Sequence, residues 1–189
     1  KPRPINFLQV YLPTSASDDD AVKEVYAEMQ RVIETIPRRE RLVVMGDFNA
    51  RIGENHEHVS CGKFGLGETN ERGEMLLDWM EASQLIAVNT CFRHRFKERH
   101  TWTSPNGQYK NMIDYIIIRR RERIEVIDSR SLVSADCDSD HQMVWMAMKG
   151  RAWKKQNRMR RKKRDLSVLA KAAKKRIFEE KLKNKLGDD

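Results

Sequence analysis

The stretch LVVMGDFN, residues 42–49, places four apolar residues directly before a glycine, an aspartate, an aromatic residue and an asparagine. A short run that is wholly apolar is typical of a strand buried on both faces of a sheet. We therefore predict a buried strand over residues 42–45. That strand would deliver Asp47 and Asn49 at its end, where polar side chains can gather at the edge of a sheet.

The segments around this strand alternate between two hydrophobic periods. Apolar residues at spacings of three and four predict amphipathic helices, one opened by three aspartates (residues 18–20) and closed by Pro37. Aromatic and β-branched runs predict the strands. The predicted helices span residues 18–36 and 71–85, and the further strands span residues 5–11, 86–88, 124–127 and 142–148. Such alternation predicts a layered α/β domain.

The residues Ser104-Pro105-Asn106-Gly107 form a strong turn signal. They lie between two β-like segments, residues 101–103 and residues 112–118. We expect these two segments to be the arms of one hairpin.

Charge divides the chain into a body and a tail. The 189 residues carry a net charge of +9, yet residues 149–189 hold 17 Lys and Arg against 5 Asp and Glu. Residues 1–148 hold 20 basic and 23 acidic residues and are mildly acidic. We predict a domain over 1–148 and a basic, helical tail over 149–189, with Asp165 as a helix N-cap. Basic tails are often drawn to nucleic acid, although many serve only as solvated arms.

Further features of the sequence bear on where in the cell the protein is located. The basic run at residues 158–164 would serve as a nuclear import signal, so we expect a nuclear protein. Three widely spaced cysteines, Cys61, Cys91 and Cys137, argue against a disulfide scaffold and for a reducing, intracellular environment. The chain has no run of about 18 apolar residues, which argues against a membrane-spanning helix.

Three acidic segments contain Asp47, Asp114 and Asp140, and His141 follows the last of them. Each is weak evidence alone, because an aspartate after a strand is most often a turn former. If the three carboxylates converge, they need a cation or a shared proton, and hard oxygen ligands suit Mg²⁺, or Mn²⁺ in its place. A carboxylate on one His141 nitrogen would fix its tautomer. The set would suit metal-assisted attack of water on a phosphodiester.

Five ordered motifs carry a family resemblance: VYLPTS (10–15), GDFN (46–49), TWTSPNG (101–107), IDYIII (113–118) and DSDH (138–141). With these motifs the chain resembles the endonuclease/exonuclease/phosphatase superfamily. It is most similar to the apurinic-type endonuclease domain of non-LTR retrotransposons and to craniofacial development protein 2-like proteins. The resemblance covers residues 4–148 and implies a four-layer α/β/β/α sandwich, here an incomplete one made of its C-terminal portion.

The resemblance also implies roles for matching residues. Tyr11 would contact the scissile phosphate, Asp47 would deprotonate the attacking water, and Asn49 would bind the phosphate. His141, oriented by Asp114, would act on phosphate charge or proton transfer. The metal would be held by Asp47, Asn49 and Asp140. DNA would be contacted by the basic stretch and the turn, through Arg93, Arg95, Lys97, Trp102, Asn106 and Lys110; a plain solvated loop is the other interpretation of that stretch.

One departure from the family bears on activity. The family domain begins well before the VYLPT strand, and its earlier part carries a metal-binding Glu and an Asn that have no counterpart here. We therefore expect impaired catalysis, unless another segment or chain supplies them, and a reverse transcriptase region is a further possible partner in a parent protein.

Four hypotheses follow from these patterns. The first is a metal-dependent DNA endonuclease, and the second a catalytically dead, nuclease-derived module that still binds nucleic acid. A phosphomonoesterase or lipid phosphodiesterase on the same fold is the third. A purely structural interaction protein is the fourth, which would bind a protein partner and no DNA.

Overall fold

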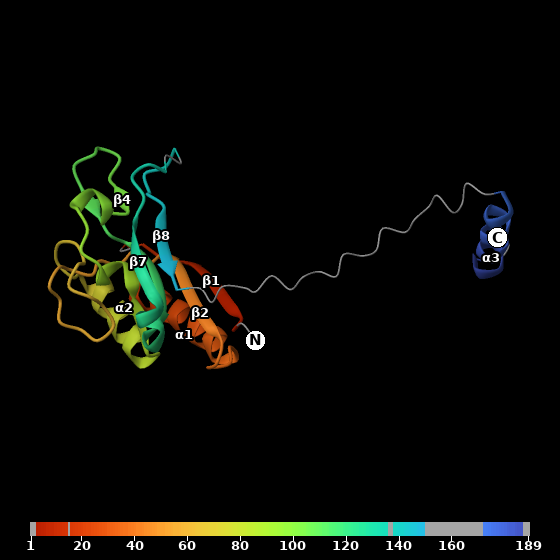
Figure 1. Ribbon diagram of the computed structural model, residues 1–189. Helices are drawn as coiled ribbons and strands as arrows, with labels where there is room; N and C mark the ends of the chain where they lie inside the picture. Colours follow the sequence, from red (N-terminus) through yellow and green to blue (C-terminus); the bar gives the residue numbers. More distant parts are fainter. Residues whose placement is uncertain (1–2, 15, 136–137, 150–171, 187–189) are drawn as a thin grey trace. The chain divides into compact units, whose positions relative to one another are not determined.

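The computed structural model describes residues 3–14, 16–135, 138–149 and 172–186. Residues 1–150 and residues 151–189 form two separate compact units. The first unit holds every strand and the candidate site, and the second holds helix α3 (Ala172–Leu186) (Figure 1). The predicted helix cap at Asp165 lies outside the described residues.

A four-stranded sheet organises the first unit. Its strands are β1 (Ile5–Tyr11), β2 (Arg41–Asp47), β3 (Leu85–Ala87) and β6 (Asp114–Arg119), in the spatial order β1-β2-β6-β3. Strand β1 runs parallel to β2, whereas β6 runs antiparallel to both β2 and β3. This pairing sets Asp47, at the end of β2, opposite Asp114, at the start of β6.

Two helices cover one face of this sheet. Helix α1 (Asp19–Thr35) begins at Asp18, whose side chain accepts a hydrogen bond from the Asp20 backbone N–H, and it ends before Pro37. Helix α2 (Glu71–Ala82) begins at Asn70. Both helices bury their apolar stripes against alternate residues of the strands. The buried members include Val22, Met29, Ile33, Leu42, Val44, Leu76, Leu77, Met80 and Ile117.

A hairpin covers part of the other face. It consists of β7 (Val126–Ser131) and β8 (Val144–Met148), which pair antiparallel (Figure 1). Its apolar residues form a second cluster with β2, β3 and β6. Strand β1 has no such cover within the described residues, and Phe7 on it is 65% exposed. The second layer therefore contains two strands, as expected for part of a sandwich.

The predicted hairpin over residues 101–118 is wrong in its second arm. Strand β4 (Trp102–Thr103) pairs with β5 (Lys110–Asn111), whereas β6 crosses into the large sheet. The turn itself forms as predicted, with the Gly107 N–H donating to the Ser104 carbonyl at 2.7 Å and a Gly107 φ of 71°. The second arm of the hairpin is therefore the short segment before the predicted one, and the predicted arm pairs within the large sheet instead.

Several predicted boundaries also shift. The second helix ends at Ala82 rather than residue 85, because Gln84 adopts a left-handed φ of 56° and Leu85 starts β3. The strand predicted from residue 124 begins only at Val126, after the 3-10 helix η3 (Arg120–Glu125). Two further 3-10 helices, η1 (Val88–Cys91) and η2 (Phe96–Glu98), connect β3 to β4. Among the described residues, no helix is long and apolar enough to cross a membrane.

Candidate active site

The edge of the large sheet gathers the first site residues. Pairing of β1, β2 and β6 sets Tyr11, Asp47 and Asp114 side by side in neighbouring strands. Gly46 allows β1 and β2 to approach here, since its φ is 146° and a Cβ atom would lie 1.9 Å from the Val10 carbonyl oxygen. The glycine of the GDFN motif is therefore a requirement of the backbone next to Asp47.

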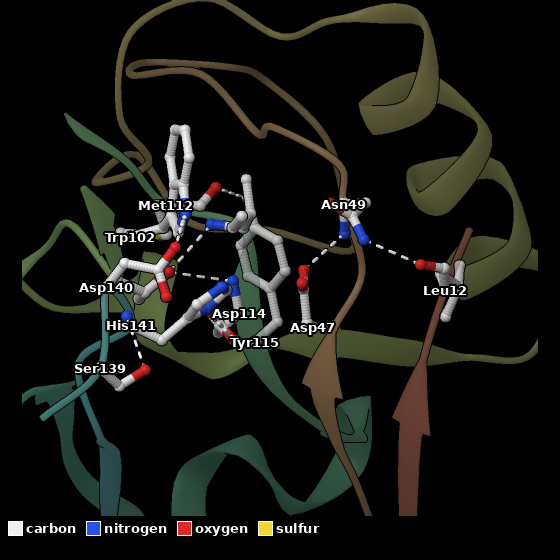
Figure 2. Close-up of polar contacts among 12 residues, drawn as sticks. Leu12, Asp47, Asn49, Trp102, Met112, Asp114, Tyr115, Ser139, Asp140 and His141 are labelled. Atoms are coloured by element: carbon white, nitrogen blue, oxygen red, sulfur yellow. Dashed lines mark hydrogen bonds and ion pairs between the residues drawn. The ribbon is translucent and has the colours of Figure 1, made fainter. Parts of the chain in front are cut away.

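Asp47 and Asn49 are fixed by short hydrogen bonds. The Asn49 backbone N–H donates to the Asp47 carboxylate at 2.8 Å, and the Asn49 side-chain amide donates to the Leu12 carbonyl at 2.8 Å. Asn49 has a left-handed φ of 47°, a conformation in which asparagine is enriched. Figure 2 shows Asn49 turned toward Leu12, so this side chain ties the loop after β2 to the end of β1.

His141 and Asp114 form a dyad. The two carboxylate oxygens of Asp114 lie 3.0 and 3.2 Å from His141 Nδ1 (Figure 2). An ionised Asp114 accepts a hydrogen bond from a protonated Nδ1, which leaves Nε2 free to act on a substrate. This arrangement is the one expected from the sequence for a histidine whose tautomer is set by a carboxylate.

Thr101 supports this dyad through hydrogen bonds, a role that the sequence alone did not indicate. Its buried Oγ1 accepts from the backbone N–H groups of Ile113 and Asp114, each at 3.0 Å. Its hydroxyl also donates to the Asp114 carboxylate. In addition, the Thr101 carbonyl accepts from the Gln142 N–H at 2.7 Å, beside His141. Thr101 lies between a basic stretch and Trp102, and nothing in the local sequence pattern predicts this supporting role.

Asp140 reaches the site through Trp102. The Trp102 indole Nε1 donates to the Asp140 carboxylate at 2.9 Å, and the Thr103 N–H donates to the Asp140 carbonyl at 2.9 Å (Figure 2). Trp102 also forms an isolated β-bridge with His141. The loop before β8 is thereby attached to the β4–β5 hairpin.

These residues line one cleft of about 520 Å³. Its wall includes Tyr11, Thr14, Asp47, Asn49, Arg51, Asn70, Trp102, Asn111, Ile113, Asp140 and His141. Arg51 is a cation that the sequence analysis did not single out. It is positioned by Asn70, whose Oδ1 accepts from the Arg51 backbone N–H at 2.9 Å while also capping α2. The sequence around Arg51 is a polar loop with no motif that predicts phosphate binding. Only the folded chain shows that this loop lies at the cleft.

The two central carboxyls are electrostatically strained. Burial raises the pKa of Asp47; the Asn49 N–H opposes this rise, Asp114 adds to it, His141 opposes it and Asp140 adds to it. Burial likewise raises the pKa of Asp114, against the lowering effect of Thr101 and His141. Each raised pKa shows that the ionised form lacks compensating positive charge in this structure.

A family model described as Endonuclease-reverse transcriptase matches residues 5–145. The chain belongs to this family. Craniofacial development protein 2 from Bos taurus is 37% identical over 144 residues, which are 76% of this chain and 24% of that relative. The chain therefore spans about a quarter of the relative's length.

Solved structures place this Endonuclease-reverse transcriptase domain in the fold of the endonuclease/exonuclease/phosphatase superfamily. The catalytic domain of Xenopus laevis APE2 matches with a TM-score of 0.54 and 18% identity, over 77% of this chain and 49% of that one. A 3' phosphatase, NExo from Neisseria, solved bound to product DNA hairpin, matches with a TM-score of 0.52 and 17% identity, over 75% of this chain and 60% of that one. At these identities the likeness shows the fold alone.

The donor set of this family member fits a divalent metal. Asp47, Asp114 and His141 each offer one ligand atom, and these atoms lie within 4.8 Å of one another. Two hard carboxylates with raised pKa values suit Mg²⁺ or Mn²⁺, since a cation would supply the missing positive charge. The predicted ligands Asn49 and Asp140 line the same cleft, and Asp140 lies outside this compact group; the role of both residues as ligands stays a prediction.

The predicted DNA-contacting residues fall into two places. Trp102 lines the cleft, whereas Arg93 and Arg95 line a different pocket with His94 and Glu98. The remaining predicted residues, Lys97, Asn106 and Lys110, are exposed.

The turn of the β4–β5 hairpin shows which of its residues remain available for contact. Asn106 orders the turn, because its Oδ1 accepts from Ser104 Oγ at 2.6 Å and from the Gln108 N–H at 3.1 Å. Tyr109, which the sequence analysis did not select, is 64% exposed. The hairpin therefore presents an aromatic ring to solvent.

The loop residues His56, His58 and Cys61 form no second metal group. His56 lies 3.9 Å from a Glu74 carboxylate oxygen, and His58 lies 3.1 Å from one of Glu81. In the part of the chain that the structure describes, the Asp47 group is the one set of three or more His, Cys, Asp and Glu side chains that meets ligand spacing.

Proposed function

We propose that this chain hydrolyses phosphodiester bonds of DNA in a reaction that depends on a divalent metal. The observation that carries the proposal is the convergence of Asp47 with the Asp114–His141 dyad on the wall of a polar cleft. Carboxylates paired with an oriented histidine form a base and a proton donor within reach of one substrate group.

Each residue has a distinct task in this mechanism. Asp47 accepts the proton of the attacking water, since its carboxylate lies on the wall of the cleft in which that water would bind. His141 uses Nε2 to hold or protonate a phosphate oxygen, while Asp114 fixes its tautomer. Arg51 and Tyr11, which line the same cleft, bind the phosphate. The carboxylates of Asp47 and Asp114 could hold a divalent metal, which would neutralise charge that develops on the phosphate.

DNA is the proposed substrate because of the cleft's surroundings. Trp102 in the wall and the exposed Tyr109 on the adjoining hairpin offer faces on which bases can stack. The related phosphatase was solved with a product DNA hairpin, and the matching family is described as an endonuclease joined to a reverse transcriptase. A reverse transcriptase region is accordingly the partner we propose for the parent protein.

Nicking of supercoiled plasmid tests this proposal. We expect nicking with Mg²⁺ that is abolished by EDTA and by Asp47→Ala, and retained in the matched control Asp78→Ala on the exposed side of α2. Circular dichroism of each variant establishes that it is folded. Folded wild-type protein that leaves the plasmid intact with both Mg²⁺ and Mn²⁺ would refute the catalytic proposal.

Nucleic-acid binding without cleavage is the second candidate. It is favoured by the tail, where 17 Lys and Arg stand against 5 Asp and Glu. Binding through such a tail would weaken steeply with salt, because each neutralised phosphate releases counterions. Fluorescence anisotropy of a labelled duplex at several salt concentrations, with and without residues 149–189, would measure this. The same tail supports a proposed nuclear location, testable with a fluorescent fusion lacking residues 158–164.

A further inference from the structure

A second cavity, of about 660 Å³, lies at the other end of the sheet from the candidate active site. It is bounded by the C-terminal ends of α1 and α2 and by the residues that follow β6. Asp114 and Arg119 are the two ends of β6, so about 17 Å of strand separates the cavity from the dyad. The two sites therefore share a strand and no lining residue.

Arginine dominates the lining of this cavity. Arg38, Arg119, Arg120 and Arg121 all contribute, and Glu34 is the one acidic residue among the lining side chains. The Glu34 carboxylate already accepts a hydrogen bond from Gln30 at 2.8 Å. The lining thus carries a formal excess of three positive charges.

Part of this positive charge serves the fold. Arg119 Nη2 donates to the Ile36 carbonyl at the end of α1, at 3.3 Å, and Arg120 Nη2 donates to Ser60 Oγ at 3.3 Å. Such contacts suit arginines near the negative ends of helices. They hold the two guanidinium groups in place without using all of their donors.

Two further guanidinium nitrogens lack a partner, and two further arginines are exposed. The Nε atoms of Arg119 and Arg120 are buried and have no hydrogen-bond partner among the described residues. Arg38 and Arg121 are exposed and form no hydrogen bond or ion pair within the described ranges. Burial lowers the pKa of Arg119, repulsion from Arg121 and Arg38 adds to this, and the neighbouring Glu122 carboxylate opposes it.

We propose that this cavity binds a small phosphorylated molecule through its phosphate groups. Guanidinium groups bind phosphate oxygens with paired, charge-assisted hydrogen bonds, and four of them match a group of two or more negative charges. The volume suits a ligand of nucleotide size, and Ile33, Ile36 and Ala82 supply an apolar wall for an organic part. The proposal is independent of the catalytic proposal, because it uses none of the same residues.

Titration calorimetry with pyrophosphate tests the inference. The full chain is used in buffer with EDTA, so that no metal can recruit phosphate to the acidic cleft. Arg38→Gln/Arg121→Gln is expected to raise the dissociation constant at least about tenfold, as the loss of charge-assisted contacts implies. The matched control is Arg39→Gln, an exposed arginine beside Arg38 that does not line the cavity, and it should change the constant less than about twofold.

Amide NMR shifts locate the bound ligand. Pyrophosphate should move the resonances of Gln84 and Arg120 and leave those of Asn49 and His141 in place. Adenosine triphosphate tighter than inorganic triphosphate would show that the apolar wall is used, whereas equal affinity would assign binding to the phosphates alone. The inference is overturned if Arg39→Gln weakens binding as much as the double variant, or if the double variant loses affinity for a DNA duplex but not for pyrophosphate.

Discussion

Replacement of Thr101 by valine should weaken the support of Asp114 while leaving the residues that line the cleft unchanged. Valine has nearly the same shape as threonine and lacks the hydroxyl. In the native protein that hydroxyl oxygen accepts from two backbone N–H groups, Ile113 and Asp114, each at 3.0 Å, in a fully buried position. Thr101→Val therefore leaves two donors without an acceptor where water cannot replace it.

The expected cost follows from those two donors. A buried donor that loses its partner costs about 1–3 kcal/mol, so two together should lower the free energy of unfolding by about 2–6 kcal/mol. Thr101→Ser keeps the hydroxyl and loses one methyl group, which costs about 0.8 kcal/mol. Valine should therefore be clearly worse than serine, although it is the better match in volume.

The same variant should act on Asp114. The Thr101 hydroxyl donates to the Asp114 carboxylate and lowers its pKa, so valine should raise that pKa further. Between the native and the variant pKa, the folded variant binds more protons than the native fold, and its stability falls more steeply as pH rises. The gap between Thr101→Val and wild type should widen with increasing pH across that window.

Urea unfolding followed by circular dichroism measures both effects. Titrations of wild type, Thr101→Val and Thr101→Ser over a range of pH give the free energies, and nicking activity gives the effect on the dyad. If Thr101→Val unfolds within about 0.5 kcal/mol of Thr101→Ser, the two hydrogen bonds do not carry the assigned energy and the reasoning fails.

Three further predictions test other parts of the structure. Asp47→Asn should lower the nicking rate by about 10²–10⁴ and remove its rise with pH, because an asparagine amide cannot accept the proton of the attacking water; rate–pH profiles of both proteins decide this. Asn70→Ala should lower the free energy of unfolding by about 1–2 kcal/mol, since it removes the α2 cap and the acceptor for the Arg51 N–H. Asn70→Asp keeps an acceptor oxygen and should not lower it. Urea titrations that give the two variants the same free energy of unfolding would contradict this role of the cap. Glu122→Gln should stabilise the fold at neutral pH, because burial raises the pKa of Glu122 and makes its ionised form a net cost; this gain should shrink as pH falls through that raised pKa toward the ordinary value of 4.5, and thermal melts that show a pH-independent gain would contradict it.

The parts of the fold that could be predicted were those governed by local periodicity. Residues 42–45 formed a buried strand because four apolar residues in a row suit a strand covered on both faces, and the first helix began and ended at its predicted aspartates and proline. The second helix ended three residues earlier than predicted, because Leu85 can be buried in a strand as well as in a helix. Local pattern does not decide between those two partners.

The hairpin error has a different physical cause. Residues 112–118 have the composition of a single strand, but Met112 is buried in the helix-side core while β6 begins only at Asp114. The choice of β2 and β3 as partners for β6 depends on contacts more than 25 residues away in sequence. Non-local pairing of this kind is not encoded in the spacing of nearby residues.

The candidate site was predictable in its reactive groups and not in its supports. Few roles other than catalysis or metal binding require two aspartates and a histidine together. In the structure, the potential ligand atoms of Asp47, Asp114 and His141 lie within 4.8 Å of one another. Thr101 and Arg51 are common residue types in unremarkable surroundings. Their importance comes from positions that only the assembled sheet and loop create.

The site depends on the β4–β5 hairpin for more than a surface on which DNA can lie. Residues 101–103 hold Asp114 through Thr101, bridge to His141 at Trp102, and bind Asp140 through both the indole and the Thr103 N–H. A DNA strand that moves Trp102 would therefore move the loop that carries His141 relative to Asp47, which β2 holds in the sheet. Engagement of the hairpin and alignment of the dyad are thus mechanically linked, so truncating the Trp102 ring should reduce turnover as well as DNA affinity.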